Sequence, residues 1–151
     1  MHCRPKLSLL LALLVPAAAF SAESAKRMEF LNPPGAEKSN YPFSQAVRAG
    51  DTLWLSGQIG IDPATGKLVE GGIAPETKQT MQNIVAALEA HGHSLRDVVK
   101  CTVMLADIAE WARFNEVYRT FFDGSFPARS ALGASGLALG ARVELECIAA
   151  R

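Results

Sequence analysis

The chain has 151 residues, a length that supports one domain, and 49% of them are hydrophobic, which is enough for a buried core. Its 15 Lys and Arg residues balance 15 Asp and Glu residues, so the formal net charge is zero. Binding to nucleic-acid phosphates needs a positive surface, so this balance argues against a nucleic-acid partner.

The N-terminus predicts a cleaved secretory signal peptide over residues 1–21. Arg4 and Lys6 precede an apolar run that ends at residue 20 and is too short to span a bilayer as a helix. Small residues then allow cleavage after Ala19 or Ser21, with an uncleaved anchor as the alternative. Loss of Arg4 and Lys6 leaves 13 basic residues against 15 acidic ones. We therefore expect a slightly acidic mature protein that is periplasmic or secreted, with no membrane contact after cleavage.

Residues 22–40 are polar and contain prolines, which is typical of a linker and lead-in loop, and the folded domain is expected over residues 41–151. Alternating and helical apolar patterns predict the elements of this domain. In chain order they are strands over 44–48 and 52–59, a short strand at 68–69, a helix over 75–91, a strand over 98–106, a helix after Asp107 that ends at 123–124, and strands over 127–133 and 142–149.

Both predicted helices are amphipathic. Pro75 suits the first position of the first helix, and Gly92 its C-terminal cap. Asp107 and Glu110 have the spacing of a capping box for the second helix. Two such helices can cover only one face of the sheet, so we expect an α+β fold with a mixed β-sheet that covers its other face by oligomerisation.

The last two predicted strands carry the charged residues that indicate a function. Arg129 lies in the first, and in the second Glu144 and Glu146 alternate with apolar residues. Glutamate is a poor strand former, so two of them on one face indicate a solvent face or a polar cleft. A guanidinium can hold a carboxylate through two parallel hydrogen bonds, and a nearby carboxylate can take a proton from water. A surface salt bridge worth at most about 1 kcal/mol is the alternative reading of the same residues.

Several motifs, in the same order along residues 28–151, resemble the RidA/YjgF family of enamine/imine deaminases. They are Leu55-Ser56-Gly57-Gln58-Ile59, Asp62-Pro63 with Thr65-Gly66, Phe114-Asn115, Tyr118 with Phe121-Phe122, Pro127-Ala128-Arg129-Ser130 with Leu132, and Val143-Glu144. The resemblance implies a chorismate-mutase-like fold and a homotrimer with sites between subunits. It also implies hydrolysis of 2-imino acids to 2-keto acids and ammonia, with no cofactor and no metal.

The resemblance also assigns roles to residues. Arg129 is expected to bind the substrate carboxylate, and Glu144 to position or activate the attacking water. Ser56, Gly57 and Asn115 are expected to contact the substrate. Glycine allows close approach of a ligand, although a simple bend at the strand end is the alternative for Ser56-Gly57. Glu146 lies on the same strand face as Glu144 and could be confused with it, but a solvated charge is the favoured interpretation of Glu146.

Two positions of the expected substrate site depart from the archetypal deaminases. Phe43 stands where those proteins have a tyrosine, and Ala131 stands where they have a cysteine. Loss of one neutral hydrogen bond costs about 0.5–1.5 kcal/mol, whereas loss of a donor to developing charge lowers the rate by about 10²–10³. Because Ala131 has no thiol, covalent catalysis from that position is excluded.

Two features stay open. Cys101 and Cys147 lie on apolar strand faces, which favours two buried core thiols, although an exported compartment permits a disulfide. His91 and His93 have no neighbouring set of ligand residues in the sequence, which argues against a metal site. A non-catalytic trimer that binds small carboxylates, or one with chaperone-like or ribonuclease activity, is the alternative to an enzyme acting on imines.

Overall fold

The computed structural model describes residues 28–36 and 40–151, so the predicted signal peptide and part of the predicted linker lie outside the described residues. The strands are β1 Glu29–Leu31, β2 Ala46–Ala49, β3 Thr52–Leu55, β4 Gln58–Ile59, β5 Ile61–Asp62, β6 Lys67–Leu68, β7 Val98–Leu105, β8 Ala128–Gly133 and β9 Val143–Ala150. The helices are α1 Ile73–Ala90 and α2 Trp111–Tyr118.

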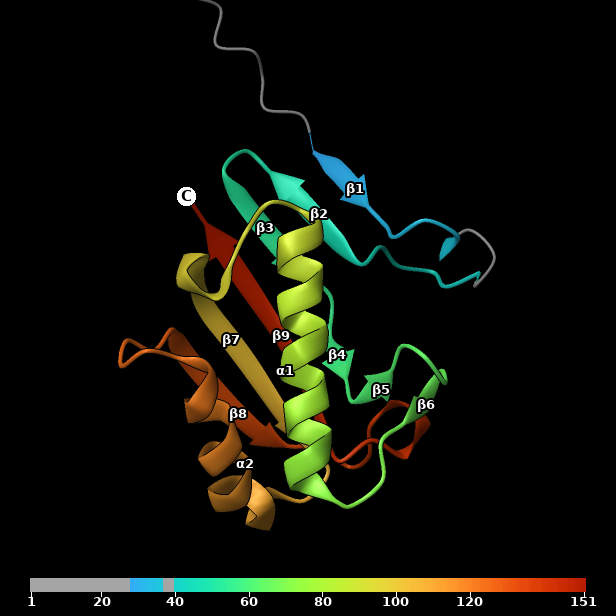
Figure 1. Cartoon of the computed structure of the whole chain (residues 1–151), viewed down its shortest axis with the longest axis vertical. Helices are drawn as coiled ribbons and strands as arrows, with labels where there is room; N and C mark the ends of the chain where they lie inside the picture. Colours follow the sequence, from blue (N-terminus) through green and yellow to red (C-terminus); the bar gives the residue numbers. More distant parts are fainter. Residues whose placement is uncertain (1–27, 37–39) are drawn as a thin grey trace, which may run out of the picture.

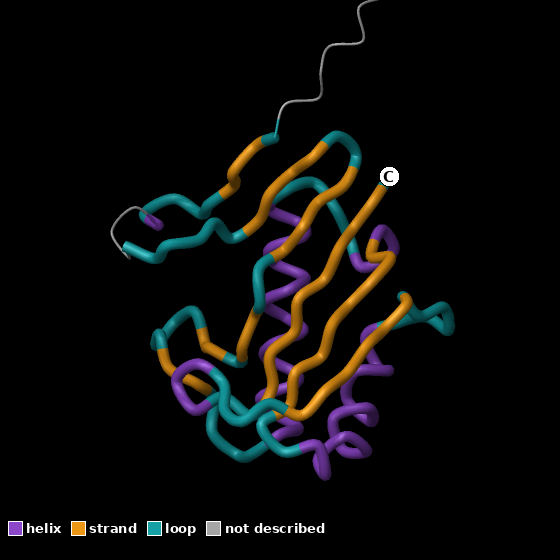
Figure 2. Tube along the Cα trace, turned by 180° about the vertical axis from the view of Figure 1, so that it is seen from behind, coloured by secondary structure: helices purple, strands orange, loops and turns teal. Residues whose placement is uncertain are grey.

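The centre of the domain is a mixed sheet with strand order β1-β2-β3-β9-β7-β8, in which β4 also pairs with β9. The β7–β8 pair is parallel and the other pairs of this sheet are antiparallel. Both α1 and α2 lie on one face of the sheet, and in the described part of the chain no α-helix covers the opposite, bare face (Figures 1 and 2). The predicted α+β class with two helices on one face is confirmed.

The core lies between this sheet and the helices. In β9 the side chains of Val143, Leu145, Cys147 and Ala149 are buried, and the residues between them face the bare side. β7 lies between β9 and β8 and contributes Cys101, Val103 and Leu105 to the same core. The alternation in β9 is therefore as predicted. No helix within residues 28–36 and 40–151 is long and apolar enough to cross a bilayer.

The structure differs from the sequence-based expectation at three element boundaries. Glu29–Leu31, within the segment expected as a linker, pairs with β2 as an edge strand, and three residues are too few to show a periodic pattern. α1 begins at Ile73 after Gly72, so Pro75 is its third residue, where its missing N–H still costs no helical hydrogen bond. Gly92 ends α1 as predicted: its N–H donates to the carbonyl of Glu89.

The predicted capping box at Asp107 is wrong in its second half. The Asp107 carboxylate accepts a hydrogen bond from the Ala109 N–H at 2.9 Å. The Glu110 carboxylate instead accepts from the guanidinium of Arg142, through contacts that include one of 3.0 Å from Nε. The chain therefore enters α2 through a short 3₁₀ turn, and Glu110 connects this turn to the residue before β9.

The expectation of two core thiols is also wrong, because Cys101 and Cys147 form a disulfide. The two residues are direct partners in the β7–β9 register, and their Cα atoms are 4.1 Å apart. Both side chains point into the core, so adjacent strands bring the sulfur atoms together. The bond joins two residues that are 46 positions apart in the chain, on neighbouring interior strands of the sheet.

We predict that reduction of Cys101–Cys147 lowers the free energy of unfolding by about 2–4 kcal/mol, because the bond restricts the unfolded chain. Denaturant unfolding with and without reductant measures this change. A double variant, Cys101→Ala with Cys147→Ala, should be insensitive to reductant. Alkylation of both thiols in denatured, unreduced protein, mapped by mass spectrometry, would contradict the disulfide.

Candidate functional site

Arg129 extends from the edge strand β8 toward the helices. In the sheet register it is the direct partner of Cys101, whose side chain points into the core. Directly paired residues share a face of a sheet, so the guanidinium lies on the helix side, against α2. Its Cζ atom lies 4.5 Å from the ring centroid of Trp111, 4.7 Å from that of Tyr118 and 5.6 Å from that of Phe114.

The guanidinium of Arg129 borders a cavity of about 400 Å³ between α2 and the start of β8. Asn115, Tyr118, Arg119, Phe126 and Pro127 complete its walls. Within the described chain the guanidinium of Arg129 contacts three aromatic rings and makes no hydrogen bond or ion pair, so its five N–H groups are free to bind an anion. The site therefore offers a fixed cation beside aromatic walls, which suits a small organic carboxylate.

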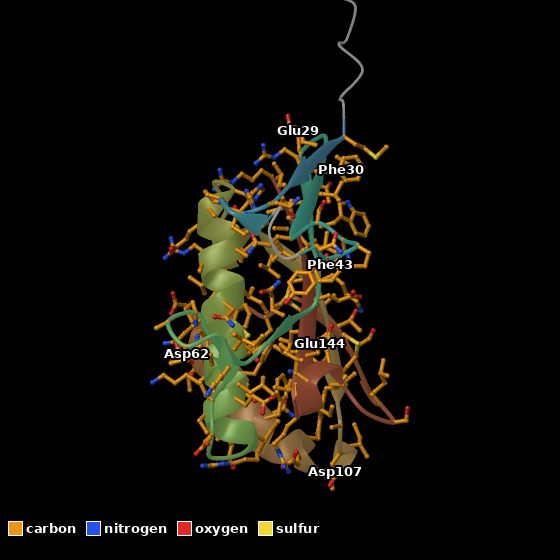
Figure 3. The ribbon with its side chains drawn as sticks, turned by 90° about the vertical axis from the view of Figure 1, so that its right-hand side faces the viewer. Glu29, Phe30, Phe43, Asp62, Asp107 and Glu144 are labelled. Atoms are coloured by element: carbon orange, nitrogen blue, oxygen red, sulfur yellow. A yellow bond between two sulfur atoms is a disulfide. The ribbon has the colours of Figure 1, made fainter. Side chains whose placement is uncertain are left out.

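Glu144 lies on the other face of the sheet. It alternates with the buried Val143 and Leu145, and its partner in β7 is Met104. Figure 3, which shows the sheet edge-on, places Glu144 on the side away from α1. Burial raises the pKa of the Glu144 carboxyl above its ordinary value, and the negative charge of Glu146 raises it further.

Gly57 allows Glu144 to lie where it does. A Cβ atom at residue 57 would come within 1.9 Å of Oε1 of Glu144, so any larger residue would displace the carboxylate. Ser56 precedes this contact at the end of β3, but its hydroxyl donates to the carbonyl of Ser44 at 2.7 Å. Ser56 and Gly57, which the sequence predicts as site residues, therefore lie on the Glu144 side of the sheet. Gly57 contacts the Glu144 carboxylate, whereas the Ser56 hydroxyl is used in a hydrogen bond within the fold.

A buried carboxylate fixes the start of β9 and thereby the position of Glu144. Glu76 in α1 is 4% exposed, and its Oε1 accepts hydrogen bonds from the backbone N–H of Arg142 at 2.6 Å and of Val143 at 3.3 Å. Gly60 lies against Glu76 so closely that a Cβ atom there would come within 2.4 Å of its side chain. The sequence shows these residues only as an ordinary first-turn glutamate and an ordinary loop glycine.

The remaining predicted residues divide between the two sides. Asn115 lines the cavity beside Arg129, and Ala131 follows Arg129 by two residues on the same face of β8. Phe43 is 59% exposed and stacks on Tyr41 with ring centroids 5.2 Å apart. Figure 3 shows Phe43 on the same side of the sheet as Glu144.

One chain thus presents two half-sites on opposite faces of its sheet. We call the group around Arg129, with Asn115 and the cavity, the cation half-site, and the group around Glu144, with Gly57, the carboxylate half-site. Within a single subunit the sheet separates them. Neither half-site alone contains both the cation and the carboxylate that the sequence predicts for the chemistry.

Other predicted features have local partners. Glu146 is exposed on the face that carries Glu144, consistent with a solvated charge. His91 contacts the Gln45 side chain at 3.3 Å, and His93 lies beside Asp97. Over residues 28–36 and 40–151 no three metal-ligand side chains come together.

Two residues of the cation half-site, Trp111 and Tyr118, are not among the site residues predicted from the sequence. The structure places both rings against Arg129. The signal in the sequence is the aromatic spacing 111, 114 and 118, which puts three rings on one face of a helix. That spacing predicts a common face but not the side chain that the rings contact.

Comparison with known proteins gives consistent relatives. The bovine protein named 2-iminobutanoate/2-iminopropanoate deaminase is 50% identical over 108 residues, 72% of this chain and 79% of the bovine protein. The mouse protein of the same name is 47% identical over 72% of this chain and 80% of its own length. The structure of RidA from a Psychrobacter species matches with a TM-score of 0.71 and 38% identity, covering 81% of this chain and 94% of that one.

A structure of E. coli TdcF with bound serine also matches, with a TM-score of 0.70 and 33% identity over 74% of this chain and 89% of that one. The family model described as "Endoribonuclease L-PSP" matches residues 35–151. The resemblance predicted from the sequence motifs is therefore confirmed, and the chain belongs to this family, the RidA/YjgF family.

Proposed function

We propose that this protein hydrolyses 2-imino acids to 2-keto acids and ammonia, with Arg129 as the carboxylate clamp and Glu144 as the partner of the attacking water. The observation that carries the proposal is the guanidinium of Arg129, which borders a cavity and makes no hydrogen bond within the described chain. Relatives that are 47–50% identical are named 2-iminobutanoate/2-iminopropanoate deaminase, which supports this choice of substrate.

The proposed reaction depends more on the orientation of the substrate than on a strong acid or base. Two parallel hydrogen bonds from Arg129 to the substrate carboxylate fix the adjoining C=N carbon in space. The oxygen of water bonds to that carbon, a proton leaves the water toward Glu144, and a proton reaches the nitrogen, which gives a carbinolamine. The hydroxyl proton is then transferred to the nitrogen as the C=O bond forms and the C–N bond breaks, which releases ammonia and leaves the 2-keto acid. A carboxylate with a raised pKa is a stronger base once ionised, which suits it to this step.

We infer that the complete site forms between subunits of a homotrimer, where the cation half-site of one chain meets the carboxylate half-site of the next. The separation of Arg129 and Glu144 by the sheet within one chain supports this. So does the bare face, on which Phe30, Val47, Trp54 and Ile148 form a row of register partners across four strands. Phe30 is 69% and Trp54 50% exposed in the single chain, and an interface would bury both.

We also infer that the protein is exported, to the periplasm or outside the cell. The N-terminal leader pattern supports this, and a Cys101–Cys147 disulfide is more stable in an oxidising compartment. A neutral whole chain, and a slightly acidic mature one, gives no support for RNA as the substrate despite the wording of the family description.

The first test follows the decay of 2-iminobutanoate, generated by an amino-acid oxidase, with and without protein. Arg129→Ala should lower kcat/KM by about 10²-fold, because it removes charge-assisted hydrogen bonds to the substrate. Arg113→Ala is the matched control, since Arg113 is exposed on α2 and pairs with Glu116. Loss of activity in Arg119→Ala rather than Arg129→Ala would move the clamp to the other arginine of the cavity.

Carboxylate binding without faster imine decay would identify a non-catalytic binding trimer instead. Suppression of aggregation that survives Arg129→Ala would indicate a chaperone-like role.

The second test asks whether the half-sites come from different chains. Arg129→Ala and Glu144→Gln should each be inactive as pure proteins. Trimers assembled from an equal mixture should recover about a quarter of the wild-type activity per chain, the share of interfaces that random assortment builds from two intact halves. Recovery should require mixing during assembly and not simple addition. No recovery in verified mixed trimers would place the site within one subunit.

The third test concerns pH. If ionised Glu144 is needed, kcat/KM should fall on acidification, with an apparent pKa above the ordinary glutamate value. Glu146→Gln removes the neighbouring negative charge, so it should shift this acid limb to lower pH. Because the pKa of Glu144 is raised in the folded state, this residue stabilises the fold most at pH values below its unfolded-state pKa. This stabilisation is lost as the pH rises through the folded-state pKa. Glu144→Gln should therefore be slightly more stable than wild type at neutral pH. An acid limb that survives in Glu144→Gln would assign it to another group.

A further inference from the structure

Arg129 lies among three aromatic rings that come from a single helical face. Trp111, Phe114 and Tyr118 follow one another at spacings of three and four residues in α2. Their rings pack in series, with centroids 6.0 Å apart between the first two and 5.4 Å between the last two. The Arg129 Cζ atom is within 6 Å of all three centroids, the range in which a ring face attracts a cation.

This contact restricts the guanidinium without using its hydrogen-bond donors. The group is planar, its five N–H groups point outward along its rim, and its two faces are available for stacking. A carboxylate partner within the protein would fix the side chain equally well but would occupy the donors that a substrate needs. Ring faces hold the cation and leave the rim free.

The ring of Tyr118, and not its hydroxyl, makes the contact with Arg129. The Tyr118 side chain is 3% exposed, and its hydroxyl oxygen has no hydrogen-bond partner in the described chain. A buried hydroxyl without a partner is unfavourable, so a phenylalanine would serve the core at least as well. The Tyr118 ring lies against Arg129 at the wall of the cavity. Trp111 is only partly buried, and its ring contacts the same guanidinium.

We propose that Trp111 and Tyr118 are positioning residues for the reaction: their ring faces hold the Arg129 guanidinium at the cavity wall with its N–H groups free for the carboxylate of a 2-imino acid. The inference rests on the proposed function. Because a clamp that is already in place holds substrate and transition state alike, losing a ring should raise KM more than it lowers kcat.

The test compares variants that remove a ring with variants that replace it. Trp111→Leu and Tyr118→Leu should each raise KM, and the Kd for 2-ketobutyrate measured by calorimetry, by about tenfold, with kcat within about twofold of wild type. Trp111→Phe and Tyr118→Phe keep a ring under the guanidinium and should return both constants to within about threefold of wild type. Phe121→Leu is the matched control, since Phe121 packs against the core just beyond α2 without touching Arg129, and it should leave both constants unchanged.

Each outcome decides the proposal. Leucine variants that fold and bind 2-ketobutyrate like wild type would overturn it. A Tyr118→Phe variant as weak as Tyr118→Leu would also overturn it, because the hydroxyl and not the ring face would then be the important group. If wild type binds 2-ketobutyrate but does not hydrolyse imines, the proposed function fails while the Kd series still tests the rings. If wild type binds no keto acid, both proposals fail.

Discussion

The pairing of β7 with both of its neighbours is the constraint on which the rest of the structure depends. Cys101 is the register partner of Arg129 on one side and of Cys147 on the other, so these three side chains share the helix face. Glu144 is an odd number of residues from Cys147 and must therefore point to the opposite face. The proposed chemistry needs a cation and a carboxylate near one carbon atom, and within one chain the sheet keeps these two groups apart.

The two half-sites are held by different physical means. Arg129 is held by ring faces, which fix a cation and leave its donors open. Glu144 is held by its strand, whose first residues are fixed by the buried carboxylate of Glu76, and by the space that Gly57 leaves. The first arrangement favours tight binding of an anion, and the second favours a carboxylate whose proton affinity is raised by its surroundings.

Local patterns predicted those parts of the fold that depend on neighbouring residues in the chain. The alternation in β9 was enough to place Glu144 on a polar face, and the apolar pattern in α2 was enough to predict an amphipathic helix. The face to which Arg129 points depends on how β8 pairs with β7. The disulfide depends on how β9 pairs with β7. Strand pairing is a long-range property, so no periodicity within either segment contains it. The same reason hides the contact between Glu76 and the start of β9, because it joins residues from separate elements.

The bond between Cys101 and Cys147 has a consequence for how this sheet assembles. A slip of β9 by one residue along β7 would turn its cysteine to the other face, out of reach of its partner. Once formed, the bond therefore excludes this slip in the folded sheet. The covalent link thus holds the alignment that places Arg129 and Glu144 on opposite faces of the sheet.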